Sequence, residues 1–248
     1  MSPNSPLGTN AAGTVVASGA TLDLAGFTLG ITESLTLSGT GSAGSNGALI
    51  NSGSATTYSG LITLGAPTTI YSENNIILSS IGTITGSGFA LTLDGAATGS
   101  SLASTIGTIA GTVTKAGAGT WTLSGGNTYS GDTTISAGTL SVTGTLGSGG
   151  IYSANISNSG TLSIGTTTQR LSGIISGTGA LEKAGAGTLI LSNANTYSGA
   201  TTISAGTLSV TGTLGSGTYS NNISNAGNTF NWNDYPKIKR NYFRNRSS

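Results

Sequence analysis

The carboxylates are the residues of this sequence best suited to catalysis. Histidine and cysteine do not occur among its 248 residues, which excludes Ser-His-Asp and Cys-His arrangements and the usual zinc sites. Residues 1–227 carry six carboxylates, separated by irregular gaps: Asp23, Glu33, Glu73, Asp94, Asp132 and Glu182. Glycosidase chemistry needs two carboxyl groups within about 5–10 Å of each other. Because the six follow no common spacing, we expect solvated turn residues and no enzyme.

A few other residues suit a binding site, but a structural interpretation is favoured for each. Trp121 lies at an alternating strand position, where a core role is expected over an exposed ring that stacks on a sugar. Tyr129 and Tyr197 lie in identical NTYSG segments and are expected to pack across neighbouring repeats. Lys115 and Lys183 precede Gly-rich turns, where a solvated corner is expected; a ladder that sets the register is the alternative.

Motifs for bound groups are missing as well. The Gly-rich GAGAGT-like runs lack the Lys-Ser/Thr ending of a phosphate loop, and the GGxGxDxUx calcium pattern is absent. We therefore predict no catalytic, cofactor-binding or metal-binding residues, no cofactor and no evident small-molecule substrate.

Short β-strands are the elements that would position all of these residues. Apolar residues alternate with Thr, Ser or Asp at Leu22/Leu24, Leu35/Leu37 and Leu91/Leu93, which is typical of half-buried strands. Clusters of Gly, Ser, Thr and Asn separate the strands, as at 39–47 and 95–101, and indicate turns. No stretch has a helical apolar stripe, so an all-β fold is expected.

A long internal repeat gives the strands their order. The segment 115–149 returns at 183–217 with only five differences. A Gly-Thr-apolar-x-apolar motif begins at Gly119, Gly138, Gly160, Gly187 and Gly206, at intervals of 19, 22, 27 and 19. Units of about 20 residues bury an apolar face only by stacking. Because the first three intervals together equal the offset of the long repeat, three coils per unit are expected.

The repeat therefore predicts a right-handed parallel β-helix, in which each strand pairs with the next coil about 4.8 Å away. About ten coils would give a rod about 50 Å long. A β-sandwich is the alternative, but that fold does not require repeats. The expected organisation is a frayed lead-in at 1–12, a solenoid at 13–227 with long units at 115–182 and 183–227, and a tail at 228–248.

Two windows of this repeat carry a family likeness. Residues 117–142 and 185–210 closely resemble the autotransporter-associated β-strand repeat of bacterial autotransporter passengers. The resemblance implies a β-helical stem that is exported by a signal peptide and crosses the outer membrane with the help of a C-terminal β-barrel. It also implies an extracellular or outer-membrane location. Neither a signal peptide nor a barrel is visible, so the chain expressed alone is expected to be cytoplasmic, and host surface ligands remain unknown.

The tail differs abruptly from the body. It has no Gly and holds five of the eight basic residues: Lys237, Lys239, Arg240, Arg244 and Arg246. Basic and aromatic residues together could bind nucleic acid or an anionic membrane surface, but a frameshift explains more. One extra G before a suitable codon choice for 160–182 yields Gly227 to Ser248 residue for residue, followed by a stop. We therefore expect an irregular, non-native tail derived by frameshift, and no nucleic-acid partner.

These observations predict a structural stem segment of an autotransporter passenger, truncated by the frameshift. Three alternatives stay open. An adhesin segment that binds host glycans or proteins would need an exposed aromatic strip or apolar patch. A β-helix polysaccharide hydrolase or lyase would need carboxylates clustered on one face. A decayed gene product without function would need neither.

Overall fold

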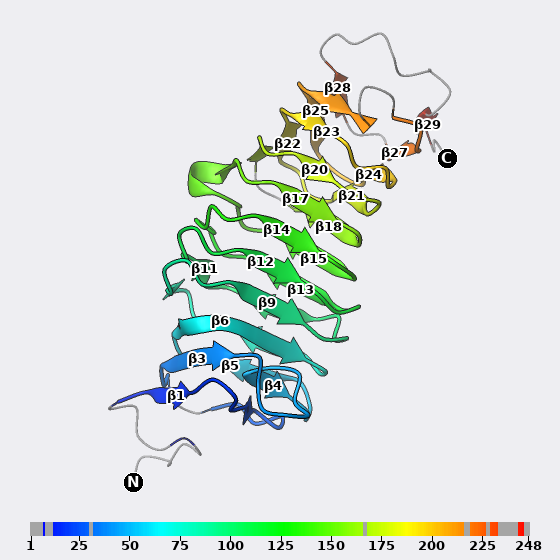
Figure 1. Ribbon diagram of the computed structural model, residues 1–248. Coiled ribbons are helices and arrows are strands. Elements are labelled where there is room, and N and C mark those ends of the chain that lie inside the picture. Colours follow the sequence, from blue (N-terminus) through cyan, green and yellow to red (C-terminus); the bar gives the residue numbers. More distant parts are fainter. Residues whose placement is uncertain are drawn as a thin grey trace.

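The computed structural model is a β-solenoid of about ten turns (Figure 1). It describes residues 7, 12–29, 32–165, 168–215, 219–226, 229–232 and 243–245. These residues form 29 short strands and a single 3-10 turn at Ser148–Gly150, without an α-helix. Every strand pair is parallel, as each coil stacks on the one before. The all-β parallel β-helix predicted from the repeat is thus confirmed, while its right-handed winding stays a prediction.

Each coil has three sides, which we call side 1, side 2 and side 3. The strands of side 1 are β2 (Leu22–Asp23), β4 (Leu49–Asn51), the second half of β6 (Ile62–Ser72), β9 (Leu91–Asp94), β12 (Val113–Lys115), β14 (Thr133–Ile135), β17 (Ile156–Asn158), β20 (Ile175–Ser176), β23 (Ala194–Asn195) and β26 (Thr213–Leu214). The strands of side 2 are β5 (Thr56–Tyr58), β7 (Ile76–Leu78), β10 (Ser100–Leu102), β13 (Thr120–Leu123), β15 (Thr139–Val142), β18 (Thr161–Ile164), β21 (Ala180–Lys183), β24 (Thr201–Ile203), β27 (Ile223–Asn225) and β29 (Phe243–Asn245).

Side 3 is less regular than the other two. Its strands are β1 (Thr14–Val16), β3 (Leu35–Gly39), the first half of β6, β8 (Thr83–Ile84), β11 (Thr105–Ile106), β16 (Ile151–Tyr152), β19 (Gln169–Leu171), β22 (Thr188–Leu191), β25 (Thr207–Val210) and β28 (Thr229–Trp232). Strand β6 is long enough to turn a corner, so its first half pairs with β3 and its second half with β4 and β9. Sides 3 and 1 are therefore continuous with each other in this early coil.

The core is a stack of inward-facing apolar side chains from all three sides. Strands of four residues such as β15 and β18 place their apolar residues inward, so Leu140 and Val142 are buried beside Leu162 and Ile164. The outward positions are mostly Thr and Ser, whose shapes suit a pleated surface. A coil of about 20 residues cannot bury its own apolar face, and stacking supplies the missing partner.

The offset of the long repeat spans three turns and one third of a turn, which corrects the expected three coils per unit. Lys115 ends a strand of side 1, whereas Lys183 ends a strand of side 2. The motif at Gly187 likewise precedes a strand of side 3, although the motif at Gly160 precedes one of side 2. Between them, β21 on side 2 lacks the Gly-Thr start, because its first residue is Ala180. The long interval between these two motifs is therefore one coil plus one side.

Buried asparagines hold the corners of successive coils together. The Asn127 side chain accepts a hydrogen bond from Ile106 N at 3.0 Å in the preceding coil and donates to Thr145 O at 3.0 Å in the following one. Asn195, its counterpart one repeat later, accepts from Ile175 N at 2.9 Å. One amide thus satisfies backbone groups in neighbouring coils that would otherwise be buried without partners.

Two strands of the tail continue the solenoid. The backbone of β28 pairs with β25, and that of β29 pairs with β27. The register places Phe230 opposite Leu208 and Trp232 opposite Val210. In the long repeat, β28 takes the place that β18 holds one unit earlier, so TFNW replaces TLSI. Both sequences alternate polar and apolar residues, which explains the strand. Most of the tail lies outside the described residues.

Candidate functional site

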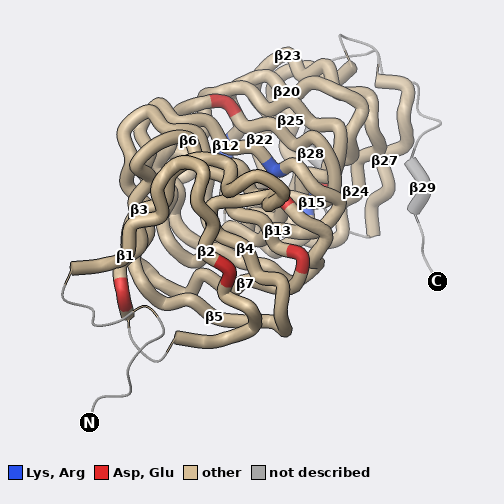
Figure 2. Tube along the Cα trace, turned by 60° about the horizontal axis from the view of Figure 1, so that its bottom comes forward, with Lys and Arg blue, Asp and Glu red and all other residues tan. Residues whose placement is uncertain are grey.

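Asp23, Asp132 and Glu182 are exposed or half-exposed, at turns or at outward strand positions, and each accepts a hydrogen bond from a neighbouring coil. Asp132 accepts from Asn155 N at 2.9 Å, and Glu182 accepts from Ser204 Oγ at 3.1 Å. Asp23 accepts from Ala25 N at 2.8 Å and from Ser52 N at 3.0 Å. Figure 2 shows how few charged residues the solenoid carries and how they are scattered along it. Among the described residues, no three acidic side chains come together as a metal site.

The Asp23 carboxyl is held in its charged form. Partial burial by itself raises its pKa, but the hydrogen bonds from the Ser52 side chain, Ser52 N and Ala25 N outweigh that effect. The pKa of Asp23 therefore lies below its ordinary value, as expected for a carboxylate that accepts several hydrogen bonds. This group acts as an anionic cap between two coils.

Glu33 corrects the expectation of solvated turn residues, because it is buried. Its Oε1 accepts a hydrogen bond from the Thr14 hydroxyl, whereas Oε2 has no partner among the described residues. The Glu33 carbonyl also accepts a hydrogen bond from the Tyr58 hydroxyl. The burial follows from the position of Glu33, two residues before the inward-facing Leu35, which gives its side chain the inward direction of the alternation.

Lys115 and Lys183 are also buried, so the expected solvated corner is wrong for both. Each ammonium donates to the carbonyl two residues further along its own chain. The second acceptor lies in a neighbouring coil: Ala137 O for Lys115 at 3.3 Å, and Gly165 O for Lys183 at 2.9 Å. Each lysine therefore joins two coils at a corner, which makes the alternative interpretation, a device that sets the register, the better one.

Burial disfavours the charge of both lysines. Desolvation lowers the pKa of Lys115, and the carboxylate of Asp94 opposes that shift in part. Desolvation also lowers the pKa of Lys183, for which no such carboxylate contributes. Lowered lysine pKa values are common at catalytic sites, but the hydrogen-bond acceptors of both ammonium groups among the described residues are backbone carbonyls. Their geometry supports a structural role.

The aromatic residues take the structural roles expected of them. Trp121 is buried in the core, and its Nε1 donates to Asp94 O at 3.0 Å. Tyr129 packs edge-on against Tyr152 of the next coil, with 5.5 Å between the ring centroids. Both hydroxyls bond Thr133 Oγ1, at 2.8 and 2.7 Å. A second cluster repeats this layout with Tyr197, Thr201 and Tyr219.

A cleft lies beside the early coils, within the part of the chain that the structure describes. It has a volume of about 190 Å³ and lies between the 40–47 turn and strands β4 and β6. Its lining residues are Gly44, Ser45, Asn46, Ile50, Asn51, Ser52, Tyr71 and Glu73. Sequence reasoning missed it, because the cleft exists only once stacking brings 44–46 beside 71–73. The one signal in the sequence was the strand alternation of β6, which directs the Tyr71 side chain outward.

One wall of this cleft is fixed by internal hydrogen bonds. The buried Asn51 side chain accepts from Gly26 N at 2.8 Å and donates to Ser54 O at 2.7 Å. The Ser52 hydroxyl donates to the Asp23 carboxylate. The cleft therefore has a preorganised polar wall beside a tyrosine ring and a carboxylate, which is an arrangement suited to binding a small polar ligand.

The architecture defines a class: this is a parallel β-solenoid protein built from stacked coils of about 20 residues. The family model of the passenger-associated transport repeat matches residues 113–142 and 181–210. The chain thus carries two such repeats, in the pattern of an autotransporter passenger repeat protein, as the resemblance implied. No curated protein and no solved structure matches the chain. Within the described residues, no helix has the length and apolar character to cross a membrane.

Proposed function

We propose that the chain is a structural stem segment of an autotransporter passenger, displayed at the cell surface and without enzymatic activity. The observation that carries this proposal is the use of the repeat residues for stacking. Within the matched windows, Lys115, Asn127 and Tyr129 all bond or pack against a neighbouring coil. A segment whose distinctive side chains bond its own coils is suited to hold a rod together.

The hydrogen bonds of the carboxylates also support a structural function. Asp132 and Glu182 accept hydrogen bonds from the following coil, which supports a role in joining turns over a role in acid–base catalysis. A polysaccharide hydrolase would need a second carboxyl group near the first. The match of the two repeats to the passenger-associated transport repeat supports surface display, in which the rod would act as a spacer.

A display experiment tests this function. The chain is placed between an export signal and an outer-membrane barrel, and surface protease resistance is measured in intact cells. Deleting one coil in register, Thr120–Gly138, should leave a resistant, exported rod, because Thr139 stacks at the position of Thr120. Deleting residues 121–130 shifts the remaining strands by half a coil and should abolish resistance. Loss of export with the in-register deletion would contradict a stem function.

A further inference from the structure

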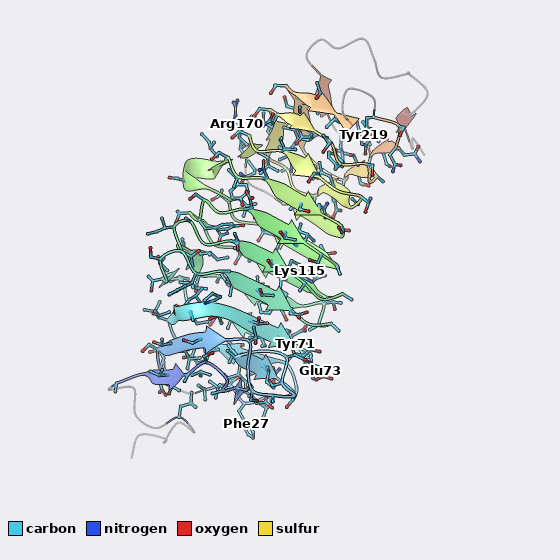
Figure 3. All side chains as sticks on the ribbon, viewed as in Figure 1. Phe27, Tyr71, Glu73, Lys115, Arg170 and Tyr219 are labelled. Atoms are coloured by element: carbon cyan, nitrogen blue, oxygen red, sulfur yellow. The ribbon has the colours of Figure 1, made fainter. Side chains whose placement is uncertain are left out.

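The cleft at Tyr71 and Glu73 contains polar groups that the fold does not use. No hydrogen bond within the described residues engages the Tyr71 hydroxyl, the Glu73 carboxylate or the Asn46 amide. The neighbouring Asn51 amide, by contrast, is fully hydrogen-bonded: it accepts from Gly26 N and donates to Ser54 O and Asn75 O. Figure 3 shows Tyr71 and Glu73 at the same edge of the rod. Groups that the stacking of coils leaves free are available for a ligand.

The strands around the cleft place acids next to the tyrosine ring. Tyr71 stands opposite Asp94 on the following strand and opposite Ile50 on the preceding one. Ile50 in turn stands opposite Asp23. Neighbouring strands are about 4.8 Å apart, so carboxylates lie within a few strand spacings of the ring on both sides along the rod. Glu73 adds a third carboxylate in the cleft itself.

Among the described residues, Lys115 offsets part of this negative charge, because its ammonium interacts with the Asp94 carboxylate, whereas no described base pairs with Glu73. Lys115 and Lys183 are buried against carbonyls. Among the side chains that the structure describes, Arg170 is the only exposed base, and it lies toward the other end of the rod from Tyr71 (Figure 3). A concave site with uncompensated carboxylates raises the local concentration of cations. The face of an aromatic ring also attracts a cation.

We propose that this cleft binds a small organic ammonium, held between the Tyr71 ring and the Glu73 carboxylate, with Asn46 hydrogen-bonding the rest of the ligand. The volume of about 190 Å³ is below the roughly 300–1,000 Å³ of clefts for drug-sized ligands. A single amino sugar or a short alkylamine therefore suits it. An ion pair and a cation–π contact in a solvent-accessible cleft contribute only about 1 kcal/mol each, so we expect an affinity no tighter than the millimolar range.

The test uses the full chain and three probes at pH 6, followed by NMR shift titration. The probes are D-glucosamine, the neutral D-glucose, and 1,5-diaminopentane, which has ammonium groups without a sugar ring. Both amines should bind saturably, and glucose should not. If only glucosamine binds, the ligand class narrows to amino sugars. Equal binding of glucose and glucosamine, or no binding of any amine at millimolar concentrations, would overturn the proposal.

Two variants and a control locate the site. Glu73→Gln and Tyr71→Leu should each weaken amine binding about three- to tenfold, through loss of the ion pair and of the cation–π contact. Glu182→Gln removes the same charge elsewhere on the rod, where its side chain bonds Ser204, and should leave binding unchanged. Equal weakening by Glu73→Gln and Glu182→Gln would mean that net charge alone attracts the amine, and would overturn the site.

Discussion

Lys115 and Lys183 occupy the same place in the repeat but stand on different sides of the solenoid. Lys115 lies opposite Ile135 in a strand of side 1, and Lys183 lies opposite Ile203 in a strand of side 2. Both are nevertheless buried and donate to the carbonyl two residues further along, but the second acceptor lies in the following coil for Lys115 and in the preceding coil for Lys183. The repeat therefore fits two different sides of the solenoid, because each side offers the same alternation and each corner offers carbonyls within reach of the lysine.

The buried lysines make a first prediction about stability. Lys183→Met should lower the free energy of unfolding by roughly 1–3 kcal/mol, because the carbonyls of Gly165 and Gly185 lose their donor in the interior. Urea denaturation measures the change. Leu181→Met is the control, since it faces inward in the same strand and a volume-conserving apolar exchange costs less than about 1.5 kcal/mol. Equal losses for the two variants would contradict the role of the ammonium.

The stability difference between the parent chain and Lys183→Met should depend on pH. Burial lowers the pKa of Lys183 in the folded state below the ordinary value of 10.5. At pH values between the folded pKa and 10.5, the unfolded chain therefore binds more protons than the folded chain. The cost of burying the charge is thus present at neutral pH and falls as pH rises toward 10.5. The stability difference between the parent chain and Lys183→Met should therefore widen on going from neutral to alkaline pH. A difference that narrows would count against a buried ammonium.

Buried tyrosines predict alkaline unfolding. Burial raises the pKa of five of them: Tyr58, Tyr129, Tyr152, Tyr197 and Tyr219. For Tyr129 the pKa rises from 10.0 to about 12. A raised folded pKa contributes stability that is complete below the unfolded pKa and is lost as pH climbs toward the folded value. Between pH 10 and 12, tyrosinate absorbance and loss of circular dichroism should appear together. Ionisation of these tyrosines near pH 10 in a folded chain would contradict their burial.

A strained turn offers a stabilising substitution. Ile109 has a φ of 57°, whereas Gly177, its counterpart in the next long unit, has a φ of 101°. A left-handed conformation costs a β-branched residue about 1–2 kcal/mol, and the Ile109 side chain is 62% exposed, so little burial is lost. Ile109→Asn should raise the free energy of unfolding by about 1 kcal/mol, because Asn tolerates this conformation. Urea denaturation of the two chains measures the gain.

Ile81 supplies the control for this turn. It is 90% exposed but is not among the residues with positive φ. Ile81→Asn should therefore leave the stability unchanged or slightly lower. A gain at both positions would show that removing an exposed isoleucine, and not relief of backbone strain, is responsible.

The origin of the tail stays a prediction that the gene can test. The nucleotides around codon 227 should contain one G more than the repeat at codon 160, and the alternative frame should continue GTLSIGTTTQRLSG. A gene in which no shifted frame continues the repeat would refute the frameshift. The pairing of β28 does not conflict with it, because the shifted reading keeps the alternation that β28 needs.

Local alternation made most of the fold predictable from sequence. The alternation of polar and apolar residues in TWTL correctly predicted that Trp121 lies in the core. The same alternation predicts an inward direction for Lys115, two residues after the inward-facing Val113, but the charge of a lysine favoured a solvent-exposed position. Its burial depends on two corner carbonyls that exist only after stacking. Sequence reasoning therefore succeeded where one strand decides the outcome.

Features that depend on several coils were harder to predict from the sequence. The Tyr71–Glu73 cleft needs the 40–47 turn to lie beside β6, which the spacing of Gly-Thr motifs does not reveal. The extra third of a turn in the long repeat was hidden because Gly179-Ala180 breaks the Gly-Thr pattern on side 2. Both depend on coil register, which follows from the whole stack and not from any one repeat.

If the rod is built from interchangeable coils, it should tolerate the removal of one coil. Thr120 and Thr139 stand opposite each other on neighbouring strands, so deleting Thr120–Gly138 removes one turn and leaves the rest in register. Hydrogen exchange should then show the strands Leu91–Asp94 and Thr161–Ile164 as protected as in the parent chain. Deletion of residues 121–130 should expose them. Equal loss of protection in both variants would contradict a solenoid of interchangeable coils.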